Sequence, residues 1–264
     1  MRVADALAAP GLDPREPRIL LADATGFSLA SLLAHPEREL TAEAAARFEA
    51  NAGRRRAGEP VAYILGRREF YGLEFAVTPA VLIPRHETEL LVERALACRP
   101  ASVLDLGTGS GVVAITVKRH LPGARVVAVE ASAAALAVAQ RNAVKLGAAV
   151  ELRHGQWFGP VDGERFDVVV SNPPYVAEGD RHLAEGDVRF EPRGALLAGA
   201  DGLDDIRAIV RAAPAYLRPG GSLLLEHGFD QDAEVGRLMR EAGFMAVETW
   251  PDLAGIARVT GGKV

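Results

Sequence analysis

Residues 102–111 read Ser-Val-Leu-Asp-Leu-Gly-Thr-Gly-Ser-Gly, and this stretch decides the fold. Its first half is short, apolar and bounded by a glycine-rich turn, which predicts a buried strand over 102–106. The glycines predict a tight turn into a helix over 112–120. Such a turn lets the backbone approach a ligand closely and directs amide groups and a helix N-terminus toward it. The stretch therefore predicts a strand, a turn and a helix that together hold a nucleotide-like ligand.

Apolar strand-like runs and helical stretches alternate from this point to the end of the chain. The alternation builds βαβ units and predicts an α/β fold, a mainly parallel sheet covered by helices on both faces. The link between the last two strands is too short for a crossover helix, so these strands should be antiparallel. The other expected strands are 125–130, 150–153, 166–171, 222–227, 244–249 and 256–260, and the other helices 87–97, 133–146, 203–216 and 231–242.

The residues before this region predict a separate helical part. Residues 1–68 contain no good strand pattern but several helical ones, among them a helix that follows Thr41 and is stopped by Gly53 and Gly58. Residues 69–84 read as two short strands around turns, a β-hairpin that links the two parts. We expect a helical domain over 1–68, a hairpin linker over 69–84 and the α/β domain over 85–264.

Composition limits the classes of function. The 264 residues carry a net charge of −5, which argues against a protein that binds nucleic acid by covering its phosphates. No apolar stretch could span a membrane, and the N-terminus has no secretory signal. A single cysteine excludes a disulfide framework and a multi-cysteine zinc site, so no metal site is expected. These features favour a cytoplasmic protein.

The candidate ligand contacts begin with Gly107, Thr108, Gly109, Ser110 and Gly111. The glycines also fit the dinucleotide pattern G-x-G-x-x-G/A, so they do not by themselves choose a cofactor. Glu130 ends the next expected strand, where it could accept hydrogen bonds from both ribose hydroxyls of a nucleoside. NAD and S-adenosylmethionine both contain a ribose whose hydroxyls could donate to Glu130.

The tetrapeptide Asn172-Pro173-Pro174-Tyr175 follows the expected strand 166–171, at the edge where an open α/β sheet binds its ligand. It resembles the (N/D)-P-P-(Y/F/W) motif of methyltransferases that modify planar nitrogens. This resemblance implies S-adenosylmethionine as cofactor, with S-adenosylhomocysteine as product. It also implies the class I methyltransferase fold, a seven-stranded, mainly parallel sheet with a reversed last strand.

The tetrapeptide suits the nitrogen of an amide, whose lone pair is delocalised. We expect the Asn172 side-chain oxygen and a main-chain carbonyl, that of Pro173, to accept the two N–H groups, so that the lone pair turns toward the methyl group. The prolines make these acceptors rigid. Tyr175 could stack on the flat substrate group.

The chain as a whole resembles the bacterial peptide chain release factor glutamine methyltransferases, over about residues 14 to 260. The segments that carry the resemblance, beside the tetrapeptide, are 58–66, 68–72, 82–89, 191–196, 201–204, Glu226 with Gly228 and Gln231, and 252–258. His86 departs from the family pattern, in which a proline follows the arginine of the I-P-R-P-x-T-E motif.

The resemblance implies a substrate, the glutamine of the Gly-Gly-Gln loop in class I release factors, methylated on its side-chain amide nitrogen (N5). It assigns cofactor contacts to residues 107–111, Glu130, Trp157 and Asn172, with Trp157 packed on the adenine ring. The substrate would meet residues 172–175, Arg85 and Thr88. The helical domain and hairpin would clamp the release factor, and we expect the enzyme to be a monomer.

Three alternatives are weighed against this interpretation. A sister family methylates a glutamine of a ribosomal protein, but it usually has P-R-S-P-I-A-E where this chain has Pro84-Arg85-His86-Glu87-Thr88-Glu89. An N6-adenine methyltransferase could use the same tetrapeptide on a flipped base, but the acidic charge and the lack of a basic recognition domain argue against DNA or RNA. The third alternative is a cofactor-dependent scaffold or a haem-related accessory protein. The sequence has no haem-ligand motif that would support it.

Overall fold

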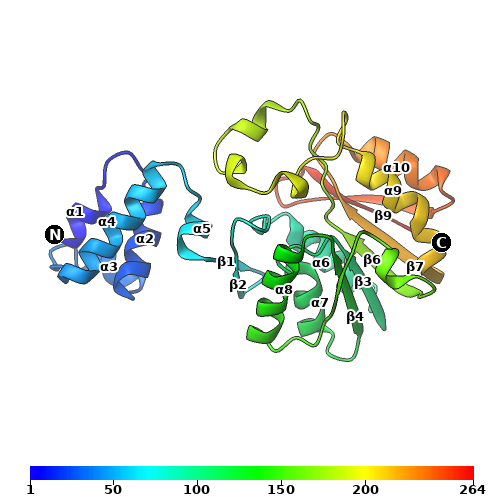
Figure 1. Ribbon diagram of the computed structural model, residues 1–264, viewed down its shortest axis with the longest axis horizontal. Coiled ribbons are helices and arrows are strands. Elements are labelled where there is room, and N and C mark those ends of the chain that lie inside the picture. The colour runs from blue at the N-terminus through cyan, green and yellow to red at the C-terminus, as the bar shows by residue number, and fades with distance from the viewer. The chain divides into compact units, whose positions relative to one another are not determined.

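The computed structural model describes residues 1–264 and divides the chain into two compact units (Figure 1). The helical unit consists of Met1–Arg67 and a second segment, His182–Phe190. The sheet unit consists of Arg68–Arg181 and Glu191–Val264. The sequence did not predict that residues 182–190 belong to the helical unit.

Five short helices form the helical unit around one apolar core. Its largest buried side chains are Leu20, Leu21, Leu32 and Phe48. The helices are α1 (Val3–Leu7), α2 (Glu16–Thr25), α3 (Leu29–Ala34), α4 (Ala42–Arg56) and α5 (Val61–Leu65).

Helix α4 differs from its prediction at its C-terminal end. The Thr41 side chain caps the first turn as expected, accepting a hydrogen bond from the backbone N–H of Ala44 at 3.1 Å. The helix then continues through Gly53 to Arg56. A glycine inside a helix costs only about 1 kcal/mol relative to alanine, which the burial of Phe48 and Ala52 outweighs. The turn comes instead at Gly58, whose φ is +95°.

The second segment joins the helical unit through Arg55 of α4. Its Nη1 donates to Asp187 Oδ1 at 2.8 Å, and its Nε donates to Glu16 Oε1 at 2.7 Å. The Arg55 side chain is only 19% exposed, so it links the segment to α2 from a partly buried position.

The sheet unit contains a seven-stranded sheet in the order β5-β4-β3-β6-β7-β9-β8. Strand β9 runs antiparallel to both neighbours, whereas the pairs on the other side of β7 are parallel. The predicted fold, with its reversed last strand, is therefore confirmed. The strands are β3 (Ser102–Leu106), β4 (Arg125–Glu130), β5 (Glu151–His154), β6 (Phe166–Ser171), β7 (Leu217–Glu226), β8 (Met245–Pro251) and β9 (Ala257–Lys263).

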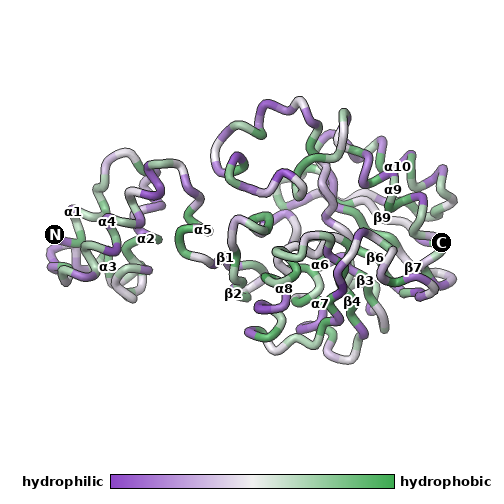
Figure 2. Tube along the Cα trace, in the orientation of Figure 1, coloured by the Kyte–Doolittle hydropathy of each residue, from purple (hydrophilic) through white to green (hydrophobic).

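Helices cover both faces of this sheet, as Figure 1 shows. The side chains of β3 alternate between two cores: Val103 packs with α6 and α7, whereas Leu104 and Leu106 pack with α9 and α10. In Figure 2 the colours of α10 alternate along the helix, as expected where one face is buried. The helices are α6 (Thr88–Ala97), α7 (Val112–His120), α8 (Ala133–Lys145), α9 (Asp204–Ala212) and α10 (Asp232–Glu241).

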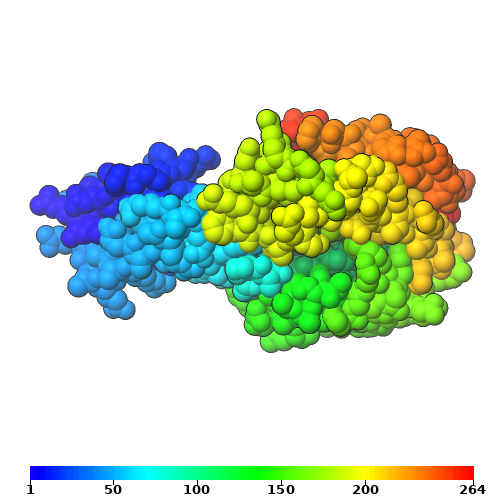
Figure 3. All heavy atoms as spheres, turned by 45° about the horizontal axis from the view of Figure 1, so that its top comes forward, coloured from blue at the N-terminus to red at the C-terminus, as the bar shows by residue number.

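Helices α9 and α10 lie side by side on the sheet unit, with the yellow atoms of α9 beside the orange atoms of α10 in Figure 3. No helix of the chain is both long and apolar enough to cross a membrane.

The hairpin begins earlier than the sequence predicts. Its strands are β1 (Arg67–Phe70) and β2 (Leu73–Ala76). The buried Asn142 of α8 pairs with the end of β2: its Oδ1 accepts from the Ala76 N–H at 2.7 Å, and its Nδ2 donates to the Ala76 carbonyl at 2.9 Å. The same Nδ2 donates to the Ser110 carbonyl at 2.8 Å, so Asn142 connects the hairpin to the glycine turn.

Candidate active site

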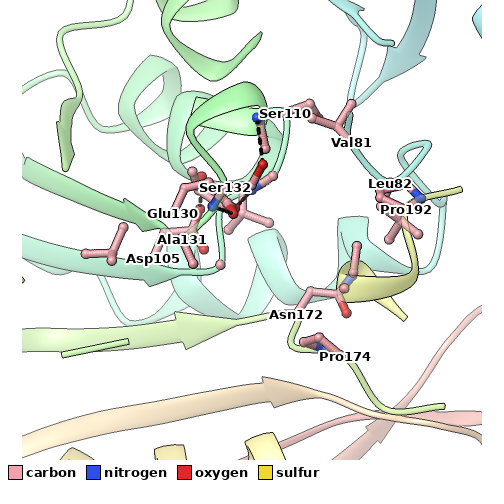
Figure 4. Close-up of a pocket in the computed structure, with 18 of the residues that line it drawn as sticks. Val81, Leu82, Asp105, Ser110, Glu130, Ala131, Ser132, Asn172, Pro174 and Pro192 are labelled. Carbon is pink, nitrogen blue, oxygen red and sulfur yellow. Dashed lines mark hydrogen bonds between the residues drawn. The ribbon is translucent and has the colours of Figure 1, made fainter. Parts of the chain in front are cut away.

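A cavity of about 560 Å³ lies in the sheet unit at the carboxyl ends of β3, β4 and β6. Figure 4 shows Asn172 and Pro174 on one side of it, and Glu130, Ala131 and Ser132 grouped on the other. The sequence-predicted residues that line it are Arg85, Thr88, Gly107, Thr108, Gly109, Ser110, Glu130, Trp157, Asn172 and Pro174. Three other predicted site residues, Gly111, Pro173 and Tyr175, are not among its lining side chains.

Glu130 holds the glycine turn in place. Its Oε2 accepts from the Gly109 N–H at 2.9 Å and its Oε1 from the Ser132 N–H at 2.8 Å. The backbone N–H groups of Gly107 and Thr108 both donate to the carbonyl of Val129, at 2.9 and 3.1 Å. A carboxylate has about four lone-pair sites, so Glu130 keeps acceptor capacity toward the cavity.

Gly107 and Trp157 form one wall of the cavity. Gly107 has a φ of +71°, and a Cβ there would lie 3.4 Å from Cζ3 of the Trp157 ring. The indole therefore rests close against the glycine backbone, and both line the cavity. A flat aromatic face beside a carboxylate suits a nucleoside, whose base can stack while its ribose hydroxyls donate.

Asp105 supports the glycine turn from below. Its Oδ2 accepts from the Thr108 hydroxyl at 2.6 Å and from the Ala114 N–H at 3.2 Å. Burial raises the pKa of this carboxyl to about 6, against the opposing effect of these hydrogen bonds. The sequence analysis assigned it no role.

Asn172 follows β6 directly, and its side chain is oriented by α6. Its Nδ2 donates to the Thr88 hydroxyl oxygen at 3.2 Å. The amide oxygen, Oδ1, is thus the end of the group that remains to accept a hydrogen bond in the cavity. Beside it the Ser171 hydroxyl donates to the Leu106 carbonyl at 2.7 Å, which ties the end of β6 to β3.

Tyr175 is held at both ends by residues that follow or end β7. Its hydroxyl donates to Glu226 Oε1 at 3.5 Å, and its carbonyl accepts from Gln231 Nε2 at 3.0 Å. Gly202 packs against the same carbonyl, because a Cβ at Gly202 would lie 2.3 Å from it. Burial raises the pKa of the Tyr175 phenol above its usual value. The stacking of Tyr175 on a substrate stays a prediction.

Arg85 lies at the cavity wall in an ion pair with the buried Glu191. Its Nη2 is 2.6 Å from Glu191 Oε2, and Glu191 Oε1 accepts from the Ile83 N–H at 3.4 Å. Next to Arg85, His86 Nε2 lies 3.0 Å from Arg68 Nη2. Since arginine only donates, His86 Nε2 is the acceptor in this contact.

Several residues that shape the site were given no role in it from the sequence. Glu191, Glu226 and Gln231 belong to the segments that carry the family resemblance, but the resemblance alone did not indicate their contacts. Asn142 was not singled out at all, because its partners Ala76 and Ser110 are distant in the sequence.

Two family models match the chain. Residues 86–190 match a model described as "Methyltransferase small domain", and residues 2–66 match the "PrmC N-terminal domain".

Curated relatives match over almost the whole length. A protein named release factor glutamine methyltransferase from Burkholderia pseudomallei is 52% identical, over 99% of this chain and 95% of its own. A protein of the same name from Bordetella pertussis is 49% identical, over 98% of this chain and 97% of its own.

Solved structures match the fold at low sequence identity. The Thermus thermophilus 16S rRNA N2 G1207 methyltransferase, solved with AdoMet and guanosine, has a TM-score of 0.53 at 24% identity, over 75% of this chain and 49% of its own. The hMettl16 catalytic domain, solved with an RNA hairpin, has a TM-score of 0.57 at 16% identity, over 73% and 76%. These likenesses concern the fold alone.

Proposed function

The chain belongs to the release factor glutamine methyltransferase family, and from this premise we propose that it methylates N5 of the glutamine in the Gly-Gly-Gln loop of class I release factors. It is an S-adenosylmethionine-dependent enzyme, and S-adenosylhomocysteine is the product. The observation that carries the proposal is the position of Asn172 and Pro174, which line the same cavity as Gly107, Glu130 and Trp157.

The residues of the cavity fit S-adenosylmethionine. The close approach of Trp157 to the backbone of Gly107 provides a flat apolar surface for an adenine. The Glu130 carboxylate, fixed by the N–H groups of Gly109 and Ser132, has acceptors for ribose hydroxyls. When bound, this group supplies an electrophilic methyl on a sulfonium.

Asn172 and Pro173 would activate the substrate by accepting its hydrogens. We assign one amide N–H of the glutamine to Asn172 Oδ1, which the Thr88 contact leaves facing the cavity, and the other to the Pro173 carbonyl. Held this way, the nitrogen directs its lone pair at the methyl group, and the positive charge that grows on nitrogen meets fixed dipoles. The methylated nitrogen then loses a proton readily, so the chemistry requires no dedicated base.

Arg85, Thr88 and the helical unit complete the proposal. Arg85 and Thr88 line the cavity, and we assign them to substrate contact. The helical part, residues 1–68, with the hairpin linker over 69–84, would recognise the release factor for the methyltransferase domain over 85–264. We propose that the enzyme works as a monomer in the cytoplasm, with no nucleic acid or membrane as partner.

The test is incubation with radiolabelled S-adenosylmethionine and a panel of release factor, ribosomal protein and DNA, followed by mapping of the labelled atom. We expect label on the side-chain nitrogen of the loop glutamine of the release factor. The matched control is a release factor with glutamate at that position, which should stay unlabelled. Label that persists in the control, or that appears only on ribosomal protein or DNA, would contradict the proposal.

A further inference from the structure

A buried carboxyl group lies behind the tetrapeptide, and the mechanism above leaves it without a task. Glu226 ends β7 and is 1% exposed. Its Oε1 accepts from the Tyr175 hydroxyl at 3.5 Å, and its Oε2 has no hydrogen-bond partner. A buried carboxyl with an unpartnered oxygen is costly, which suggests that it serves the site rather than stability.

Thr88 connects this carboxyl to Asn172. The Thr88 hydroxyl oxygen accepts from Asn172 Nδ2 at 3.2 Å. The same hydroxyl lies close enough to Glu226 to lower the pKa of that carboxyl as a hydrogen-bond donor. A hydroxyl has one hydrogen to donate. Because an ionised carboxylate can only accept, Thr88 must give that hydrogen to Glu226, and it can then only accept from Asn172.

We propose that the Glu226 carboxylate acts through Thr88 as a positioning group that holds Asn172 with its amide oxygen toward the substrate. The proposal rests on the proposed function, because only an amide substrate that donates N–H groups needs an oxygen at this position. Glu226 itself touches neither cofactor nor substrate in this scheme.

Protonation of Glu226 would remove this constraint. A neutral carboxyl can donate to Thr88, and Thr88 can then donate to Asn172 Oδ1. The amide would turn over and present its NH₂ group to the cavity. The NH₂ group of Asn172 and the N–H groups of the substrate amide, which are all donors, would then face each other. The lone pair of the substrate nitrogen would no longer be oriented.

The charges around Glu226 place this change near neutrality. The groups that act on it are Tyr175 on the tetrapeptide, Glu87 and Thr88 at the start of α6, and Arg258 on β9. Burial, with a smaller contribution from Glu87, raises the pKa of Glu226 to about 7 against the opposing effects of Thr88, Arg258 and Tyr175. Asn172 would be correctly oriented above this pH and released below it.

The first experiment measures the single-turnover rate of release factor methylation against pH, with saturating S-adenosylmethionine. We expect the wild-type rate to fall with decreasing pH below about 7, approaching tenfold per pH unit. Glu226→Gln should lower the rate at high pH by about tenfold to a hundredfold, the range for a lost charged hydrogen bond. Its profile should lack the acidic fall, since glutamine neither ionises nor selects one direction of donation.

The variants of Thr88 provide a second, independent test. Thr88→Val removes the hydroxyl and should reproduce both the loss of rate and the flat profile. Thr88→Ser keeps the hydroxyl and should restore both. Glu248→Gln, at an exposed position of β8, is the matched control and should behave as wild type.

A double-mutant comparison tests orientation directly. In Asn172→Asp both terminal atoms of the side chain are oxygens. Rotation of this group therefore cannot turn a donor toward the substrate. We expect Glu226→Gln to lower the methyl-transfer rate little or not at all in the Asn172→Asp background, although it lowers the rate clearly in the wild-type background. A purely structural role of Glu226 would instead give losses that multiply.

Two outcomes overturn the inference: a Glu226→Gln enzyme with the wild-type rate and pH profile, or equal losses from that change in the wild-type and Asn172→Asp backgrounds. Either would be seen while the wild-type enzyme labels glutamine, so the proposed function would stand. If the wild-type enzyme labels no glutamine at any pH, the proposed function fails first and the positioning role falls with it.

Discussion

Two buried carboxyl groups of the sheet unit differ in how their oxygens are used. Asp105 accepts from the Thr108 hydroxyl and the Ala114 N–H, so its hydrogen bonds hold the glycine turn. Glu226 has one long hydrogen bond from Tyr175 and an unpartnered oxygen. The pKa of each is raised by burial, to about 6 and about 7. Of these two carboxyl groups, only Glu226 has few hydrogen bonds to its oxygens. We therefore expect its negative charge to lower the free energy of unfolding.

We therefore expect Glu226→Gln to stabilise the protein at alkaline pH. The pKa of Glu226 is higher in the folded state, about 7, than its ordinary value of 4.5. Its contribution to stability is thus present below pH 4.5 and lost as the pH rises through 7. The glutamine variant should gain on the order of 3 kcal/mol in free energy of unfolding near pH 8.5, as judged by urea denaturation. Glu248→Gln should show no gain, and a less stable variant near pH 8.5 would contradict the expectation.

Asn172→Ala should separate chemistry from cofactor binding. Removing the acceptor for one substrate N–H should lower the methyl-transfer rate by about a hundredfold to a thousandfold. Binding of S-adenosylmethionine, measured by calorimetry, should be weaker but still detectable, because Glu130 and Trp157 are unchanged. An alanine variant with the wild-type transfer rate would exclude Asn172 as the acceptor.

How far the sequence predicts a site residue depends on where its partners lie. Gly107, Glu130 and Asn172 directly follow or end apolar strands, and that position indicates the ligand edge of a parallel sheet. Their gathering around one cavity agrees with that expectation. The contact of Asn172 with Thr88 joins residues 84 positions apart, which no local pattern can reveal.

Among the elements, α7 depends on the conformation of the residue before it. Gly111 has a φ of +86°, and a Cβ there would lie 2.7 Å from Ile115 Cδ1 and 3.3 Å from Ala139 Cβ. Its glycine is thus required by the turn and by the packing of α7 on α8, although Gly111 does not line the cavity.

Gly111→Ala should accordingly destabilise the sheet unit. Positive φ and a sub-contact distance together should cost about 1–3 kcal/mol of unfolding free energy, measured by denaturation without cofactor. Gly123→Ala is the matched control, because nothing lies within 4 Å of a Cβ there and its φ is not in the positive region. Equal stabilities of the two variants would show that the turn adapts.

The strands that the sequence predicts best are those buried on both faces. The bounds of β3, β4 and β6 agree with prediction because their apolar runs are continuous and end at turns. The first hairpin strand begins at Arg67, before the predicted hairpin, because Arg67, Arg68 and Glu69 show no apolar alternation. The last residue of this strand, Phe70, packs edge-on against Phe75 of β2, so only its C-terminal end carries an apolar signal.

At the scale of the molecule, the helical unit is built from two separate parts of the chain. Segment 182–190 follows the tetrapeptide closely, yet it belongs with α4 rather than with the sheet. The sequence could not indicate this, because the segment forms only short 3₁₀ turns without buried residues. Its connection depends on Arg55, whose pairing with Asp187 spans 132 positions.

The last prediction concerns this connection. Asp187→Ala removes the partner of Arg55 on segment 182–190 and should loosen this segment from the helical unit. Other contacts of the segment, such as that of Arg189 with Gly58, remain in the variant. If the helical unit recognises the release factor, a loosened segment must be ordered at each binding event. We expect KM for the release factor to rise by up to about fivefold, the value of a partly exposed ion pair.

Cofactor affinity should stay unchanged in Asp187→Ala, because the cavity that would hold S-adenosylmethionine lies wholly in the sheet unit. Glu185→Ala is the matched control: it alters an exposed acid of the same segment and should change neither quantity. Limited proteolysis should cut segment 182–190 faster in Asp187→Ala alone. Faster cutting with an unaltered KM would mean that the ion pair orders the segment without serving substrate recognition, and the segment would then be a structural part of the helical unit only.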